Sequence, residues 1–344
     1  MSLILIGLDE AGYGPLLGPL CVGMCAVRVH NWRPGEPAPN LWKVLKKGVT
    51  RNPARAKTRV PVEDSKKLKL PNDSPRHPLL HLEHGVLAWL GTQQHRPATD
   101  AELFALLGVE AEAHAWYEGD ACALPVAHDP ATMAVAANML ATACAAAGVE
   151  LLALRCIAVG EVRYNGIVAA QRTKAATTAA ALREHLHLAW ERWGTHAADH
   201  GPDFHPRVVC DRQGGRTQYA EFLADLMPRC ADGEAPIEVM MLEESAAISR
   251  YDITHSPRAR RMAITFQPEA ETAHLPVALA SMVAKLCREL MMARFNRYWA
   301  ARAAEAGMTH LKPTAGYRTD AWRWLKDADP IMNREERERM VRVL

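Results

Sequence analysis

Two short apolar runs, separated by a loop of glycine, proline and leucine, constrain the fold of this chain most strongly. Residues 2–9 and 20–29 each indicate a buried strand, because both runs are short, apolar and bounded by Gly or Pro. The intervening loop, GYGPLLGP, is unsuited to a helix because glycine and proline interrupt it throughout. The sequence therefore predicts a hairpin whose first strand ends at Asp9 and Glu10.

The rest of the pattern predicts an α/β protein. Helical periodicity and strand-like apolar runs alternate after residue 130, which favours a mixed sheet flanked by helices. Between residues 31 and 130 the chain is Pro-rich, charged and irregular, which indicates an inserted region of mixed helix and loop. The expected helices span 79–91, 100–108, 134–148, 169–193, 217–227 and 276–307, and the expected strands span 150–160, 206–211, 237–242 and 262–266.

These elements divide the chain into four parts. Residues 1–30 form the first part of the sheet domain, and residues 31–130 form the insertion or accessory region. Residues 131–290 form the remainder of the sheet domain, and residues 291–344 form a helical C-terminal segment.

Composition narrows the class of protein. Of 344 residues, 49% are hydrophobic and 23% are charged, which is typical of a globular protein with a substantial core. The eight cysteines are scattered and include no CxxC pair, so we expect reduced thiols and neither zinc nor disulfides. The N-terminus has no basic signal-like region and residues 133–148 are short and Ala-rich, so we expect a cytoplasmic protein with no membrane partner. A monomer is favoured.

The charge distribution is more informative than the net charge of +2. Residues 43–69 contain ten Lys or Arg and two acids. Such a basic stretch either contacts phosphates or is a solvated loop.

Carboxylates at strand ends are the main chemical feature. Asp9 and Glu10 end one apolar strand and Asp211 ends another, so they converge if both strands are central. Crowded carboxylates repel one another, and a hard cation such as Mg²⁺ or Mn²⁺ relieves that repulsion. The alternative for each aspartate is a simple turn residue.

Three histidines also have helical spacing. His77, His81 and His84 approach metal-ligand spacing but lack an accompanying acid or Cys set. We therefore expect a solvated helix face rather than a zinc site.

Several segments together resemble the type 2 ribonuclease H family, the bacterial HII and HIII enzymes. DEAGYGPLLGP resembles the family signature DEAGRGPLAGP, and DSKKL at residues 64–68 is identical to its second motif. The further similar segments, in the family's order, are LWKVLKKGV, VRYNGI, VVCD, LASMVAKLCRE and AGYRT. The similarity covers roughly residues 1–30, 60–70 and 150–325.

The resemblance implies a ribonuclease H-like fold and a metal-dependent endonuclease. Such enzymes hydrolyse the RNA strand of RNA/DNA hybrids, including single ribonucleotides embedded in DNA, and leave 5′-phosphate and 3′-hydroxyl ends. That chemistry would serve DNA repair. Two Mg²⁺ or Mn²⁺ ions would activate a water and stabilise the leaving oxygen. The catalytic metal ligands implied by position are Asp9, Glu10, Asp211 and Glu271.

The resemblance also implies a set of substrate contacts. Gly12 and Gly14 would let backbone amides approach a ribose 2′-hydroxyl, Tyr317 would pack on a deoxyribose, and basic residues would lie near the cleaved strand. The implied substrate-binding residues are Gly12, Tyr13, Gly14, Lys66, Asn165, Lys285, Arg288 and Tyr317.

Two departures from the family leave alternatives open. Glu271 stands where HII enzymes usually have Asp, and Glu269 is a close competitor for the same role. Tyr13 replaces the family Arg, which exchanges a cation for a ring that could stack on a sugar or base. The alternatives are a nuclease of this fold with a changed substrate, such as structured DNA, and a catalytically weak nucleic-acid-binding protein.

Overall fold

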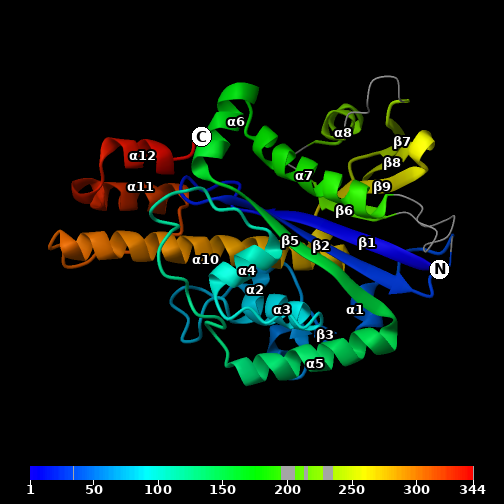
Figure 1. Ribbon diagram of the computed structural model, residues 1–344, viewed down its shortest axis with the longest axis horizontal. Helices are drawn as coiled ribbons and strands as arrows, with labels where there is room; N and C mark the ends of the chain where they lie inside the picture. The colour runs from blue at the N-terminus through cyan, green and yellow to red at the C-terminus, as the bar shows by residue number, and fades with distance from the viewer. Residues whose placement is uncertain (34, 195–205, 213–215, 228–234, 344) are drawn as a thin grey trace.

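The computed structural model describes residues 1–33, 35–194, 206–212, 216–227 and 235–343. In these ranges a seven-stranded sheet crosses the molecule in the order β5-β2-β1-β6-β9-β8-β7 (Figure 1). A separate two-stranded sheet pairs β3 with β4. The strands are β1 (Ser2–Ala11), β2 (Leu20–His30), β3 (Val49–Thr50), β4 (Val60–Pro61), β5 (Val149–Val159), β6 (Arg207–Asp211), β7 (Glu238–Glu244), β8 (Ser249–His255) and β9 (Arg260–Gln267).

The large sheet is mixed. β1 pairs antiparallel with β2, as the predicted hairpin requires, and parallel with β6. β6 in turn pairs parallel with β9, while β5, β8 and β7 join by antiparallel pairing. The predicted fold class, a mixed sheet flanked by helices, is confirmed.

Helices cover both faces of this sheet (Figure 1). The α-helices are α1 (Leu41–Val44), α2 (Ser65–Leu68), α3 (Leu80–Gly91), α4 (Asp100–Leu107), α5 (Pro130–Ala147), α6 (Glu161–Gln171), α7 (Ala175–Trp193), α8 (Ala220–Leu226), α9 (Ala270–Ala273), α10 (Leu275–Glu305), α11 (Arg318–Asp327) and α12 (Arg334–Met340). Short 3₁₀ turns span η1 (Pro53–Arg55), η2 (Ser256–Arg258) and η3 (Asp329–Ile331).

Alternation along β1 divides the core in two. Leu3 and Leu5 belong to a cluster shared with α3, α5 and α10, whereas Ile4, Ile6 and Leu8 belong to a cluster shared with α7. This is the period of two expected for a strand buried on both faces. β1 is therefore a central strand, and its end is framed by helices on both sides.

Helix α10 packs very closely on β1 and β2 because two strand positions lack a side chain. A Cβ on Gly7 would lie 2.1 Å from the carbonyl carbon of Pro276, and one on Gly23 would lie 2.1 Å from the carbonyl oxygen of Ala280. Any larger residue would force the helix outward. These glycines set the height of α10 above the strands, and with it the position of every α10 side chain that faces them.

The region predicted as an insertion is helical and packed. Its helices α1 to α4 bury Trp42, Leu82 and Trp89 in the same cluster as Met282 of α10. This shared core fixes α2, with its DSKKL sequence, against α10. The four-part division of the chain stays a prediction, and α10 runs without interruption across the expected boundary at residue 290.

Two details of the expected elements need correction. The single helix expected over 169–193 is two helices, because Arg172 adopts a left-handed conformation with φ 58° and ends α6. Strand β8 was not expected; its buried and exposed residues alternate only in part.

By length and composition alone, α5 is apolar enough to cross a membrane, and 28% of that helix is buried against the rest of the molecule.

Candidate active site

The first three predicted acids lie together near the carboxyl ends of two central strands, β1 and β6. Leu8 of β1 is paired with Cys210 of β6 in parallel register, so Asp9 and Asp211 are the next residues on two neighbouring strands. Adjacent strands lie about 4.8 Å apart. Glu10 follows Asp9, with Val22 of β2 as its partner on the other side.

Glu271 is brought to the same edge by a short helix. The Asp211 carboxylate accepts a hydrogen bond of 3.0 Å from the backbone amide of Ala270, the first residue of α9. Glu271 is the next residue and is only 8% exposed. Glu269, its competitor for the fourth position, precedes α9 with φ 52° and is exposed. The structure places Glu271, and not Glu269, in the buried position beside Asp211.

The four carboxylates perturb one another. Burial raises the pKa of Asp9 well above its ordinary value, and the charges of Glu10 and Asp211 raise it further. Burial followed by the Asp211 charge raises the pKa of Glu10 to about 7. Burial also raises the pKa of Asp211 and of Glu271, the latter with a further contribution from Asp211. Four acids therefore share a space in which full ionisation is unfavourable.

One ammonium group partly balances these acids. Burial favours the neutral form of Lys66, but the charges of Asp64, Asp9 and Glu271 outweigh it and raise the pKa of Lys66. Asp64 caps α2, since its carboxylate accepts from the Lys66 amide at 2.9 Å. It also raises the pKa of Glu271. Sequence reasoning treated Asp64 only as part of a motif and missed its place in this charge cluster.

Two serines connect the inserted region to the strand end. The hydroxyls of Ser65 in α2 and Ser281 in α10 are hydrogen-bonded, with 2.9 Å between the oxygens. An interaction with the Ser281 hydroxyl opposes the rise in the pKa of Asp9. The inserted DSKKL segment thus helps to position Asp9 although it lies more than 50 residues along the chain.

The GYGPLLGP loop, residues 12–19 and called the glycine loop below, packs on two buried guanidinium groups. Gly12 has φ 91°, and a Cβ there would lie 2.5 Å from Nε of Arg288. Arg342, 2% exposed, donates to the carbonyl oxygens of Gly12 at 2.7 Å, Tyr13 at 2.8 Å and Gly18 at 3.1 Å. Its guanidinium also lies over a tyrosine ring, 4.0 Å from the centroid. No motif marks Arg342, and its contacts lie about 330 positions away, so sequence reasoning missed it.

Two predicted substrate contacts need correction. Arg288 is fully buried and donates to the carbonyl oxygens of Leu17 and Ala315, so it supports the loop instead of facing a bound strand. The Asn165 side chain is bonded to backbone atoms of Val341 and Val343, each at 2.8 Å. The Arg288 guanidinium is buried in the protein, and the half-exposed Asn165 amide is committed to the backbone near the C-terminus.

The other predicted contacts remain accessible to different degrees. Tyr13, Gly14, Lys66 and Tyr317 are exposed. Tyr317 is 50% exposed where α11 begins, with the Arg288 guanidinium 5.6 Å from its ring centroid. Lys285 is paired with Glu289 at 2.8 Å and is largely covered.

A second acidic group lies elsewhere. Ligand atoms of Glu112, His114 and Glu161 lie within 4.8 Å of one another among the described residues, a spacing that could hold a metal ion. Glu112, however, already accepts the amides of Val162 and Arg163 at the start of α6. Glu161 accepts from a tyrosine hydroxyl at 2.7 Å and from the Gly18 amide at 3.1 Å. These bonds give the cluster a structural role in joining α6 to the glycine loop.

Comparison with known proteins gives likenesses at the level of structure only. No family model and no curated protein matches the chain. Its structure is similar to RNase HII in a complex with PCNA from Archaeoglobus fulgidus, at 12% identity and a TM-score of 0.39 over 99% of this chain and 94% of that one. It is also similar to Bst-RNase HIII in complex with Mn²⁺, at 13% identity and a TM-score of 0.39 over 99% of this chain and 66% of that one.

A further likeness is to ribonuclease H2 from Pyrococcus horikoshii OT3, at 13% identity and a TM-score of 0.35 over 98% of this chain and 95% of that one. Identities and scores of this size assign the chain to no family.

Proposed function

We propose that this protein is a metal-dependent endonuclease that hydrolyses the RNA strand of RNA/DNA hybrids or ribonucleotides embedded in duplex DNA. The observation that carries the proposal is the convergence of Asp9, Glu10, Asp211 and Glu271 beside the GYGPLLGP loop. A protein that only binds nucleic acid gains nothing from gathering four acids next to a polyanion. The products would carry 5′-phosphate and 3′-hydroxyl ends.

The acids fit a divalent cation on their own chemistry. All four donors are carboxylate oxygens, which Mg²⁺ and Mn²⁺ prefer. Oε2 of Glu271 is buried and has no hydrogen-bond partner among the described residues, so it is available as a ligand. Lys66 supplies a single positive charge against the four acids, so a divalent cation would relieve the repulsion that remains among them. Bound divalent ions would activate a water and stabilise the leaving oxygen.

The surrounding residues would align the substrate. The exposed Gly14 and the half-exposed Gly12 allow close approach of the loop backbone to a ribose 2′-hydroxyl. Arg342 and Arg288 donate hydrogen bonds to carbonyl oxygens of that loop from the protein interior, so the loop amides keep a fixed direction. The exposed rings of Tyr13 and Tyr317 are available to pack on sugars or bases.

Cleavage of three matched duplexes tests the proposal. The substrates carry a single ribonucleotide, a full RNA strand, or no ribonucleotide, and each is assayed in Mg²⁺ and in Mn²⁺. We expect cleavage of the first two, with Asp211→Asn reducing the rate at least about 100-fold because a metal ligand is lost. Cleavage of plain DNA would indicate a changed substrate, and tight binding without any cleavage would refute the endonuclease.

The fourth ligand is tested by a pair of matched variants. Glu271→Gln should abolish most cleavage, whereas Glu269→Gln should keep it, because only Glu271 is buried beside Asp211. Both substitutions keep side-chain size and remove one charge. The reverse result would assign the role to Glu269.

A further inference from the structure

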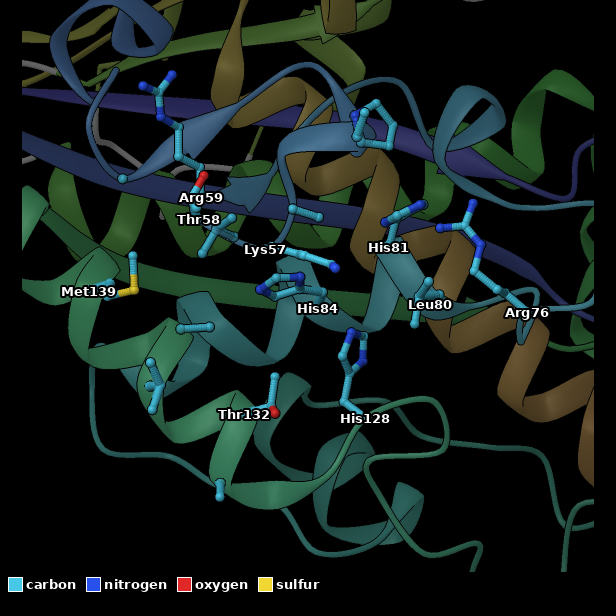
Figure 2. A pocket seen from close by; sticks show the side chains of 18 residues that line it. Lys57, Thr58, Arg59, Arg76, Leu80, His81, His84, His128, Thr132 and Met139 are labelled. Atoms are coloured by element: carbon cyan, nitrogen blue, oxygen red, sulfur yellow. The ribbon is translucent and has the colours of Figure 1, made fainter.

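A cavity of about 620 Å³ lies apart from the acidic cluster, between the β3–β4 connection, α3 and the start of α5 (Figure 2). Its volume falls in the range of small-molecule sites, about 300–1,000 Å³. It is formed largely by residues 48–84, so it uses part of the basic stretch that the sequence analysis left open between a phosphate-contacting surface and a solvated loop.

The charged lining of this cavity is entirely basic. Lys57, Arg59 and Arg76 contribute to it, and no Asp or Glu is among its lining residues. The neighbouring acid Asp129 caps α5 and is bonded to the amide and hydroxyl of Thr132. A concave surface with cations and no lining carboxylate attracts an anion and repels a metal ion.

Three histidines add hydrogen-bonding groups that the protein itself does not use. His81 and His84 are only 3% and 5% exposed, and Nδ1 of His81 and Nε2 of His84 have no hydrogen-bond partner among the described residues. The ring of His128 lies 5.2 Å from that of His84. These positions correct the expectation of a solvated helix face for His81 and His84. Buried polar atoms without partners need a ligand or water to satisfy them.

The histidines are suited to an anion rather than to zinc. Burial lowers the pKa of His84 to about 4, so its ring is neutral near pH 7 and offers one N–H donor. Glu83 behind them uses Oε2 to accept the amides of Val126 and Ala127, and its Oε1 lies 4.0 Å from Nδ1 of His128.

One wall of the cavity is apolar and open. Val135 and Met139 of α5 are 58% and 43% exposed, and Val60 and Leu80 line the inner surface. Figure 2 shows Met139 on the side of the cavity away from Arg76 and His81. The cavity therefore has a cationic, hydrogen-bonding part and an apolar part, which matches a ligand with the same division.

We propose that this cavity binds a small phosphomonoester with an apolar or aromatic body, of about the size of a mononucleotide. The phosphate lies near Lys57, Arg76 and the buried imidazoles, and the organic part packs on Val135 and Met139. The site is independent of the proposed nuclease reaction, because it shares no lining residue with the acidic cluster.

Calorimetric titration of the full chain with adenosine 5′-monophosphate tests this site. The buffer contains a chelator, so that the acidic cluster holds no metal and repels the phosphate. Wild type should bind adenosine 5′-monophosphate with a Kd of about 1 mM or lower. The double variant Lys57→Gln/Arg76→Gln should weaken binding about tenfold or more, because two charged contacts are lost. Both residues are exposed, so folding is preserved.

The matched control is Lys46→Gln/Lys47→Gln, which removes the same charge from exposed residues of the same basic stretch outside the cavity. It should leave binding unchanged, and inorganic phosphate or adenosine alone should bind more weakly than the monophosphate. Equal losses in the two double variants, equal affinity for inorganic phosphate, or absence of binding at about 1 mM would each overturn the proposal. So would saturable Zn²⁺ binding, titrated in buffer without chelator, that depends on His81 and His84 while the monophosphate does not bind.

Discussion

Replacing Asp211 by asparagine should stabilise the metal-free protein at pH 8. Asp9, near the end of β1, and Asp211, at the end of β6, occupy neighbouring positions on adjacent strands, which lie about 4.8 Å apart. Two unit charges at about that spacing repel by about 3 kcal/mol at an effective dielectric constant of 20. Asparagine keeps the acceptor for the Ala270 amide but loses the attraction to Lys66, which offsets part of this gain. A net stabilisation of about 1–2 kcal/mol remains.

The effect must depend on pH with a definite sign. The pKa values of Asp9, Glu10 and Asp211 are raised in the folded protein, that of Glu10 to about 7. The unfolded chain therefore loses its protons first, and wild type becomes less stable as pH rises from about 4 to about 7. The advantage of Asp211→Asn should be present at pH 8 and shrink toward pH 4.

Thermal unfolding in chelator measures this prediction. With an unfolding entropy of about 2.1 cal/mol/K per residue, a stabilisation of 1–2 kcal/mol raises the Tm of this chain by about 2 °C. Asp73→Asn, an exposed loop position, is the matched control and should leave Tm unchanged. Mn²⁺ should raise the Tm of wild type and have much less effect on Asp211→Asn. A lower Tm for Asp211→Asn at pH 8, with Asp73→Asn unchanged, would refute the crowding argument.

Three further substitutions test the support of the site. Gly12→Ala should lower Tm and slow cleavage, because it places a Cβ 2.5 Å from Nε of Arg288 at φ 91°; a Tm equal to wild type would contradict this close packing. Arg342→Gln should cost about 2–5 kcal/mol in unfolding free energy and speed amide hydrogen exchange in the glycine loop, since buried charged donors to three carbonyls are lost. Ser281→Ala should slow cleavage with a Tm change of only a few degrees, and an unchanged rate would exclude a positioning role for its bond with Ser65.

Local sequence patterns determined the strands β1 and β2 and the positions of three of the acids along the chain. The apolar runs around GYGPLLGP predicted β1, β2 and their antiparallel pairing, since a strand signal needs only a few consecutive residues. The same local patterns placed Asp9, Glu10 and Asp211 at strand ends. The end of α6 at Arg172 escaped prediction because one left-handed residue carries no periodic signal.

Only the tertiary structure decided how the acids at the ends of β1 and β6 come together and which distant residues hold the glycine loop beside them. The pairing of β1 with β6 brings Asp211 to Asp9, and α9 presents Glu271 rather than Glu269 to them. Arg342 reaches the glycine loop from the far end of the chain. Such contacts depend on the packing of distant elements against one core, and that packing leaves no periodic or local pattern in the sequence that could reveal it.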